Sequence, residues 1–328
     1  MKKENMLSKT VHNRSSRYLF VLLLGVTLAS GIVLYLSRGD SSTTRAGVPI
    51  EAARAFSGGT FEASGVTHVP GTDSVLFVDD GKPGEVQWMR VDREGNQSGP
   101  IKPVKIGVGI EDLEGITTDG THFYLVSSQS RPKSAEGYGL VRFKFDPASQ
   151  SVTAVESIND LKRMLVENVA ELRSYGDVKA KDDGINIEGL AWDSAGERLL
   201  IGLRSPVIDG HALIVPLKLR DPRGPFSLEN LEAKATAAIR LSLGGQGVRS
   251  IEYDERSKLF YVIAGATETQ DKTDFKLWEW GGPASQSALK EVAAFDRKLK
   301  PEGVTRASVG DSDFVFVVFD TSRYLRLK

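Results

Sequence analysis

Residues 114–116 read Glu-Gly-Ile, and residues 123–128, which follow after a turn, read FYLVSS. The first stretch places a charged residue and a glycine before an aliphatic residue. The second stretch is rich in aromatic and β-branched residues, as strands are. Together they predict a β-hairpin whose first strand starts at the Glu-Gly dipeptide.

The same unit occurs five times along the chain, which indicates a repeat architecture. The starts recur about every 50–75 residues, close to the repeat length of propeller blades. Each of the first four units also contains two further strand-like runs, so one unit holds four strands. The five units begin at Ser64-Gly65-Val66, Glu114-Gly115-Ile116, Glu188-Gly189-Leu190, Arg249-Ser250-Ile251 and Glu302-Gly303-Val304, and they continue into VLFVDD, FYLVSS, LLIGLR, LFYVIAG and FVFVVFD.

These repeats predict an all-β domain, a β-propeller of five blades over residues 49–328. The fifth unit has room for only three strands before Lys328, and an open ring would leave an unpaired blade edge. Residues 49–56, PIEAARAF, precede the first unit and are free to supply the missing outer strand. The longest interval, between the second and third starts, leaves six blades as the alternative.

That interval contains a helical insertion, predicted over residues 157–176. Its apolar residues recur at helical spacing, with Asn159 or Asp160 as the cap and Gly176 as the stop. The insertion is either a packing element or a lid over one mouth of the propeller. The apolar residues are Ile158, Leu161, Leu165, Val169 and Leu172.

An uncharged apolar segment, residues 18–36, lies near the N-terminus and is close to the length that a helix needs to cross a bilayer. Basic residues precede it, so the positive-inside rule keeps residues 1–17 as a cytoplasmic tail. Residues 18–36 would then be a transmembrane signal anchor and residues 37–48 a linker, with the propeller periplasmic or extracellular. A signal peptide cleaved near Thr27-Leu28-Ala29 is the alternative.

Composition excludes several classes of function. The formal net charge is -1, from 42 basic and 43 acidic residues, so no excess of positive charge favours nucleic acid. The absence of cysteine removes thiolate nucleophiles and cysteine-ligated zinc, and it leaves oxygen or histidine ligands for any metal. Oxygen ligands favour hard cations such as calcium.

The charged residues of the repeats are predicted to meet at one mouth of the central channel. The first strand of each blade starts at this mouth, and the second strand returns to it. The strand starts contribute Asp112, Glu114, Glu188, Arg249 and Glu302, and the ends of the second strands contribute Asp79, Asp80, Ser128, Arg131, Arg204 and Asp320.

Carboxylates that converge from several blades repel one another, and a bound divalent cation relieves this repulsion. Arginines bind phosphate or carboxylate groups through paired hydrogen bonds. The alternative is structural, because each glutamate side chain could instead cap backbone amides of neighbouring blades. The predicted cation ligands, with calcium favoured, are Glu114, Glu188, Glu302, Asp112 and Asp80. The predicted ligands of an anionic small-molecule substrate are Arg131, Arg204, Arg249 and His211.

The strings EDLEGI, NIEGLAWD, LLIGLRSPVIDGHAL, GGQGVRSIEYD and SSQSR resemble the bacterial domain-of-unknown-function 3616 family, over about residues 60–328. That resemblance implies a propeller and no particular activity. The Glu-Gly strand starts are also similar to those of phytase-like esterase and metal-dependent lactonase propellers. The second resemblance implies a divalent ion at the axis on Glu114, Glu188 and Glu302, whereas Arg249 departs from a carboxylate pattern.

Two functions follow as expectations. The first is a membrane-anchored, metal-dependent hydrolase of a phosphate or carboxylic ester, and the second is a non-catalytic propeller that binds protein or glycan. No Ser-His-Asp order or Gly-x-Ser-x-Gly elbow is legible, so no catalytic residue is predicted. The metal prediction requires the three glutamates to converge on one point, about 2.3–2.6 Å from a calcium ion.

Overall fold

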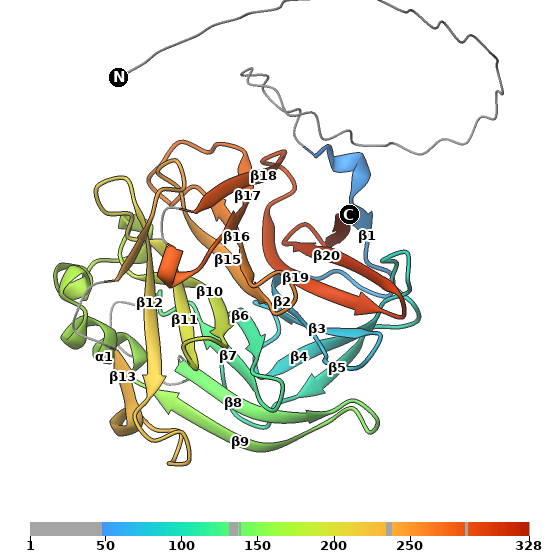
Figure 1. The fold of residues 1–328 in the computed structure, drawn as a ribbon, viewed down its shortest axis with the longest axis horizontal. Coiled ribbons are helices and arrows are strands. Elements are labelled where there is room, and N and C mark those ends of the chain that lie inside the picture. The colour runs from blue at the N-terminus through green and yellow to red at the C-terminus, as the bar shows by residue number, and fades with distance from the viewer. Residues whose placement is uncertain (1–47, 131–136, 138, 234–237, 286–287, 328) are drawn as a thin grey trace, which may run out of the picture. The chain divides into compact units, whose positions relative to one another are not determined.

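The computed structural model describes residues 48–130, 137, 139–233, 238–285 and 288–327. These residues form five antiparallel sheets whose innermost strands surround a common centre (Figure 1). The five-bladed all-β propeller is therefore confirmed. The predicted tail and signal anchor, residues 1–36, lie outside the described residues. No helix within the described ranges is long and apolar enough to cross a membrane.

Four of the five blades use strands that are consecutive in sequence. Blade 1 contains β2 (Ala63–His68), β3 (Ser74–Asp79), β4 (Glu85–Arg90) and β5 (Lys102–Lys105). Blade 2 contains β6 (Leu113–Thr118), β7 (Phe123–Ser127), β8 (Gly139–Asp146) and β9 (Ser151–Asn159). Blade 3 contains β10 (Asn186–Asp193), β11 (Arg198–Ser205), β12 (Ala212–Leu219), β13 (Leu231–Ala233) and β14 (Ile239–Leu241). Blade 4 contains β15 (Gly247–Asp254), β16 (Leu259–Gly265), β17 (Phe275–Trp280) and β18 (Leu289–Phe295).

Blade 5 joins the two ends of the domain. Its first three strands are β19 (Pro301–Val309), β20 (Ser312–Phe319) and β21 (Arg323–Leu327). The fourth is β1 (Arg54–Ala55), which pairs antiparallel with β21 and lies beside the C-terminus in Figure 1. The predicted closure by residues 49–56 is thus confirmed, although only two of those residues enter the ladder.

Hydrophobic clusters fill the interfaces between neighbouring blades. Phe77 and Val318 pack between blades 1 and 5, while Leu76 and Leu125 pack between blades 1 and 2. Each blade has a neighbour on both faces, so its second strand is buried on both sides. This burial explains why the second strands read as continuous apolar runs rather than as alternating patterns.

The segment of the predicted helical insertion, residues 157–176, starts within β9. It continues as α1 (Leu161–Asn168) and the 3-10 helix η2 (Ala170–Tyr175), which an extended Val169 separates. The five apolar residues named above are all buried, in the cluster between blades 2 and 3. No residue of this fully described segment lines the axial cavity, so it packs against the blades. The other 3-10 helices are η1 (Ile50–Ala52), η3 (Ala180–Asp182), η4 (Leu228–Asn230) and η5 (Pro283–Ser285).

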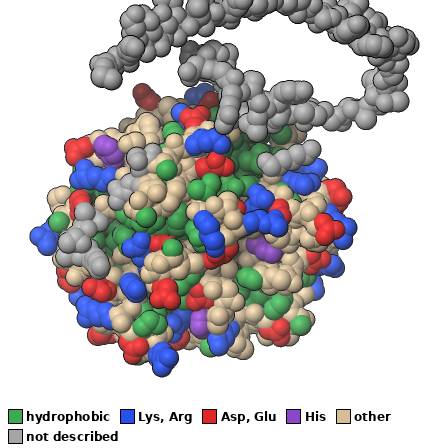
Figure 2. All heavy atoms as spheres, viewed as in Figure 1, with side chains coloured by type: hydrophobic (Ala, Val, Ile, Leu, Met, Phe, Trp, Pro, Cys, Tyr) green, Lys and Arg blue, Asp and Glu red, His purple; other side chains and the backbone are tan. Residues whose placement is uncertain are grey.

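Basic and acidic side chains are interspersed over the face that Figure 2 shows. The mixture agrees with the net charge of -1. Among the described residues on this face, therefore, no extended patch of one sign stands out. The unusual concentration of charge lies inside the ring, at the axis.

Candidate active site at the channel mouth

A β-bulge aims one side chain of each blade at the axis. In each inner strand the pairing with the second strand skips the same position of the repeat. A bulge leaves the regular alternation of a strand and redirects the side chain that it carries. All five bulged side chains line one cavity, so the structure brings the predicted strand starts together. The bulged residues are Ser64, Glu114, Glu188, Arg249 and Glu302.

The glycine after the bulge serves blade packing. A Cβ atom on Gly65 would lie 2.7 Å from the carbonyl oxygen of Glu114, and one on Gly303 would lie 2.9 Å from the backbone nitrogen of Val66. Only glycine permits such a close approach of two blades. The close packing between blades therefore depends on the glycine. The side chain of the residue before it is not needed for this packing and points to the axis.

Arg249 binds two of the three axial glutamates. Its Nε lies 2.8 Å from Oε2 of Glu188, its Nη1 donates to Oε1 of the same residue at 3.1 Å, and its Nη2 pairs with Glu302. Arg204 donates to Oε1 of Glu188 at 3.1 Å and lies 2.5 Å from Oε1 of Glu268. Both arginines are engaged by carboxylates, so they are not free to hold an anion in this arrangement.

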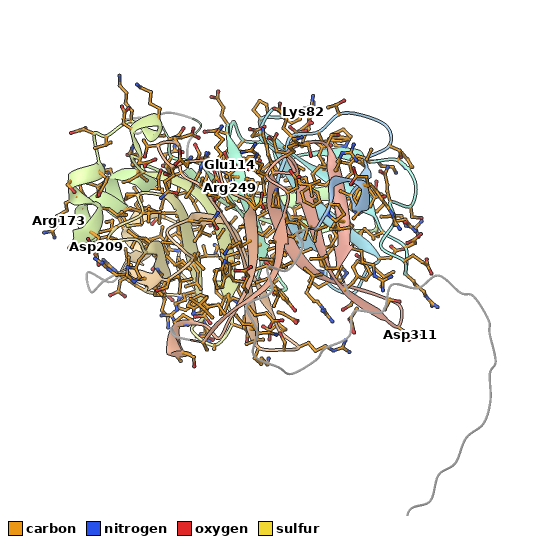
Figure 3. All side chains as sticks on the ribbon, turned by 90° about the horizontal axis from the view of Figure 1, so that it is seen from above. Lys82, Glu114, Arg173, Asp209, Arg249 and Asp311 are labelled. Carbon is orange, nitrogen blue, oxygen red and sulfur yellow. The ribbon has the colours of Figure 1, made fainter. Side chains whose placement is uncertain are left out.

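Glu114 contrasts with the other two glutamates. Its side chain is 9% exposed and lines the cavity, and its carboxylate makes no hydrogen bond or ion pair with another described residue. Ligand atoms of Glu114, Glu188 and Glu302 lie within 4.8 Å of one another. Two oxygens on one calcium ion are at most about 5.2 Å apart, so this spacing fits a single cation. Figure 3 shows Glu114 and Arg249 close together inside the ring.

Further carboxylates adjoin Glu114 on the side of blades 1 and 2. Asp112 precedes β6 with a positive φ of 54°, and its Oδ2 accepts hydrogen bonds from the hydroxyls of Ser128 and, at 3.1 Å, Ser130. Two sets of carboxylates have ligand atoms within 4.8 Å of one another, as the axial set does. These sets are Asp80, Asp112 and Glu114, and Glu62, Asp79 and Asp80.

The environment shifts the pKa values of these acids upward. Burial raises the pKa of Glu114 well above its ordinary value, and the neighbouring glutamates raise it further. Burial also raises the pKa of Glu302 to about 7, although Arg249 opposes this shift. Partial burial and a hydrogen bond with Glu62 raise the pKa of Asp80 to about 7. Two carboxyl groups therefore titrate near neutral pH, where acid or base catalysis is most effective.

The cavity has a volume of about 460 Å³, suited to a small molecule. Two lining residues that were not predicted, Glu62 and Lys300, could have been found from the repeat. Each stands two positions before a bulged residue, as the predicted Asp112 does. Lys272 and Arg297 come from loops without repeat pattern, and neither forms an ion pair with a described residue. The charged lining residues that the sequence did not indicate are Glu62, Glu268, Lys272, Arg297 and Lys300.

Two of the predicted substrate ligands are not placed at this cavity. Arg131 lies outside the described residues. His211 does not line the cavity, because its loop folds back in a tight turn with paired backbone hydrogen bonds to Ile208. Its Nδ1 lies 2.8 Å from the carbonyl oxygen of Asp209, a residue at the outer edge in Figure 3.

A buried carboxylate marks the opposite end of the channel. Glu252 stands three positions after the bulge, where three other blades carry threonine. It accepts hydrogen bonds from Thr67 at 3.2 Å, Thr117 at 3.3 Å and Thr305 at 3.0 Å. Burial raises its pKa to about 8, and the threonine hydroxyls oppose the shift. Blade 4 therefore differs from the other blades at both ends of the channel. At the charged mouth it carries Arg249 where three blades carry glutamate, and at the opposite end it carries Glu252 where three blades carry threonine.

A model of the protein family described as protein of unknown function, DUF3616, matches residues 144–328. No curated protein matches the sequence. Among solved structures, the chain is similar to the PQQ domain of pyranose dehydrogenase from Coprinopsis cinerea, at 10% identity and a TM-score of 0.44, over 84% of this chain and 97% of that one. It is also similar to the soluble aldose sugar dehydrogenase from Escherichia coli, at 11% identity and a TM-score of 0.44, over 81% and 95% of the two chains. At these scores the similarities carry no argument about activity.

Proposed function

This chain belongs to the DUF3616 family of proteins of unknown function, and because that membership assigns no activity, we propose one from the site itself. We propose that the propeller is a divalent-cation-dependent hydrolase of a small anionic ester, either a phosphate ester or a carboxylic ester. The observation that carries the proposal is Glu114, a buried carboxylate that faces the cavity without a partner among the described residues.

The residues present suit a hard divalent cation, with calcium favoured. Glu114, Glu188 and Glu302 offer oxygen ligands at the spacing of one ion. The three carboxylates outnumber the two arginines that pair with them, Arg204 and Arg249, which favours the binding of a cation. Such a cation would polarise an ester oxygen and lower the pKa of a water molecule.

The chain's own side chains supply the remaining chemistry. Lys272 and Arg297 line the cavity without described ion-pair partners, so they replace Arg204 and Arg249 as the cations that would orient the anionic group of the substrate.

The test compares the full chain, purified in mild detergent without chelator, with a Glu114→Gln variant. We expect the parent to retain a divalent cation by mass spectrometry and to hydrolyse p-nitrophenyl phosphate or p-nitrophenyl butyrate. Loss of the Glu114 charge should weaken cation binding about 10- to 100-fold or more, since the loss of an outer partner of a ligand alone costs that much. Glu252→Gln, at the other end of the channel, is the matched control and should retain both properties.

Two outcomes would contradict the proposal. A parent that binds cations but turns over neither ester would favour a binding propeller for protein or glycan. A parent that binds no calcium, magnesium, manganese or zinc at millimolar concentration would remove the basis for a cation-dependent reaction.

We also propose that residues 18–36 anchor the propeller at the cytoplasmic membrane, with residues after the linker on the periplasmic or extracellular side. The support is the uncharged apolar run and the basic residues before it. The protein should remain with membranes after alkaline carbonate extraction, and protease added to the outer side should digest it. Release of a propeller that lacks residues 1–29 would instead indicate a cleaved signal peptide.

A further inference from the structure

Two of the three carboxylate sets at the mouth share Glu114. The axial set is Glu114, Glu188 and Glu302, and the lateral set is Asp80, Asp112 and Glu114, each with ligand atoms within 4.8 Å of one another. Each set has the spacing that one cation requires. We propose that the mouth holds two divalent cations and that the carboxylate of Glu114 bridges them.

Two buried carboxylates without full partners support the presence of ligands here, independently of the clustering. Glu114 is 9% exposed and faces the cavity without a described partner. Asp79, next to the lateral set, is 2% exposed, and its Oδ2 has no hydrogen-bond partner among the described residues. A buried carboxylate oxygen without a partner costs free energy that a bound cation would recover.

The two positions differ in how much of their negative charge is already neutralised. Arg249 pairs with Glu188 and Glu302, and Arg204 also pairs with Glu188. In the axial set, therefore, Glu114 alone has no basic partner among the described residues. No described arginine or lysine forms an ion pair with Asp80, Asp112 or Glu114. The lateral position is therefore the tighter of the two, and the axial position fills second.

The proposed function left the choice between a phosphate ester and a carboxylic ester open. Two bridged cations favour one of them, and this conclusion rests on the proposed function. Paired cations about 3.5–4 Å apart are suited to phosphoryl transfer, because they contact both the entering and the leaving oxygen. The substrate is then a phosphate ester. In its hydrolysis, the bond from phosphorus to the ester oxygen breaks, the bond from phosphorus to the water oxygen forms, and a water proton passes to the leaving alcohol.

Calorimetric titration of the cation-depleted full chain with calcium chloride tests the two positions. We expect two ions per chain with distinct affinities in the parent. Glu302→Gln should keep the tight ion and lose the weak one, whereas Asp112→Asn should lose the tight ion, and Glu114→Gln should weaken both. Glu252→Gln is the control and should bind two ions, and circular dichroism confirms that each variant is folded.

The outcomes separate this inference from the proposed function. One ion per chain in the parent, or a single ion that both Glu302→Gln and Asp112→Asn abolish, would overturn the bridged pair. Hydrolysis of p-nitrophenyl phosphate by a one-ion protein would keep the proposed function and reject the inference. Two ions without hydrolysis of either ester would keep the two positions and reject the hydrolase.

Discussion

Replacing Arg249 with methionine should lower the free energy of unfolding by about 3–5 kcal/mol, the usual cost of removing one partner of a buried ion pair. The guanidinium is 6% exposed and pairs with Glu188 and Glu302, both of which are also buried. Without it, Glu302 would lie unpaired beside Glu114, and Glu188 would retain only Arg204 as a partner. Burial already disfavours the charged form of Glu302. Chemical denaturation at neutral pH measures the change.

The matched control for this prediction is Arg90→Met. Arg90 forms an ion pair of comparable geometry with Asp73, but both side chains are largely exposed to solvent. Its loss should change stability by about 1 kcal/mol or less. Equal effects of the two substitutions would mean that the axial ion pairs contribute no more than surface pairs do.

Replacing Glu252 with glutamine should remove a large part of the pH dependence of stability. Burial raises the pKa of Glu252 from 4.5 to about 8, so the folded state holds its proton more tightly than the unfolded state does. A raised pKa contributes stability that is complete below the unfolded value and is lost as pH rises through the folded value. The parent should therefore lose stability relative to Glu252→Gln between about pH 4.5 and 8.

The expected size of this effect is a few kcal/mol, because each pKa unit corresponds to about 1.36 kcal/mol. Chemical denaturation of both proteins at pH 5, 7 and 9 gives the difference between their free energies of unfolding. The acids at the other mouth are the same in both proteins, so their contributions cancel in this difference. Glu279→Gln, a carboxylate more accessible to solvent and paired with Lys290, is the control and should show no such trend. A difference between parent and Glu252→Gln that is independent of pH would contradict the assignment.

The sequence was sufficient for the ring and for the five strand starts that face its mouth. Repeated strand starts predicted five blades, and the short fifth unit predicted closure by residues 49–56, as the pairing of β1 with β21 confirms. The strand directions also indicated which side chains would meet. Both results depend on the order and direction of the strands, which the repeat in the sequence shows directly.

Side-chain partners at the mouth could not be predicted in the same way. Arg249 pairs with Glu188 and Glu302, whereas Glu114 has no such partner among the described residues. This difference depends on distances across the axis between blades far apart in sequence. Lys272 and Arg297 reach the cavity from loops that carry no repeat. His211 stands where a propeller loop can reach the mouth, yet local turn hydrogen bonds direct it outward.

The β-bulge that recurs in every inner strand separates the five axial side chains from the strand pairing. A bulged residue takes no part in the ladder, so its side chain can be exchanged without changing strand register or the packing between blades. Blades 1 and 4 illustrate this freedom, with serine and arginine where the other three carry glutamate. The scaffold therefore permits relatives to alter the chemistry of the mouth one blade at a time while retaining the same ring.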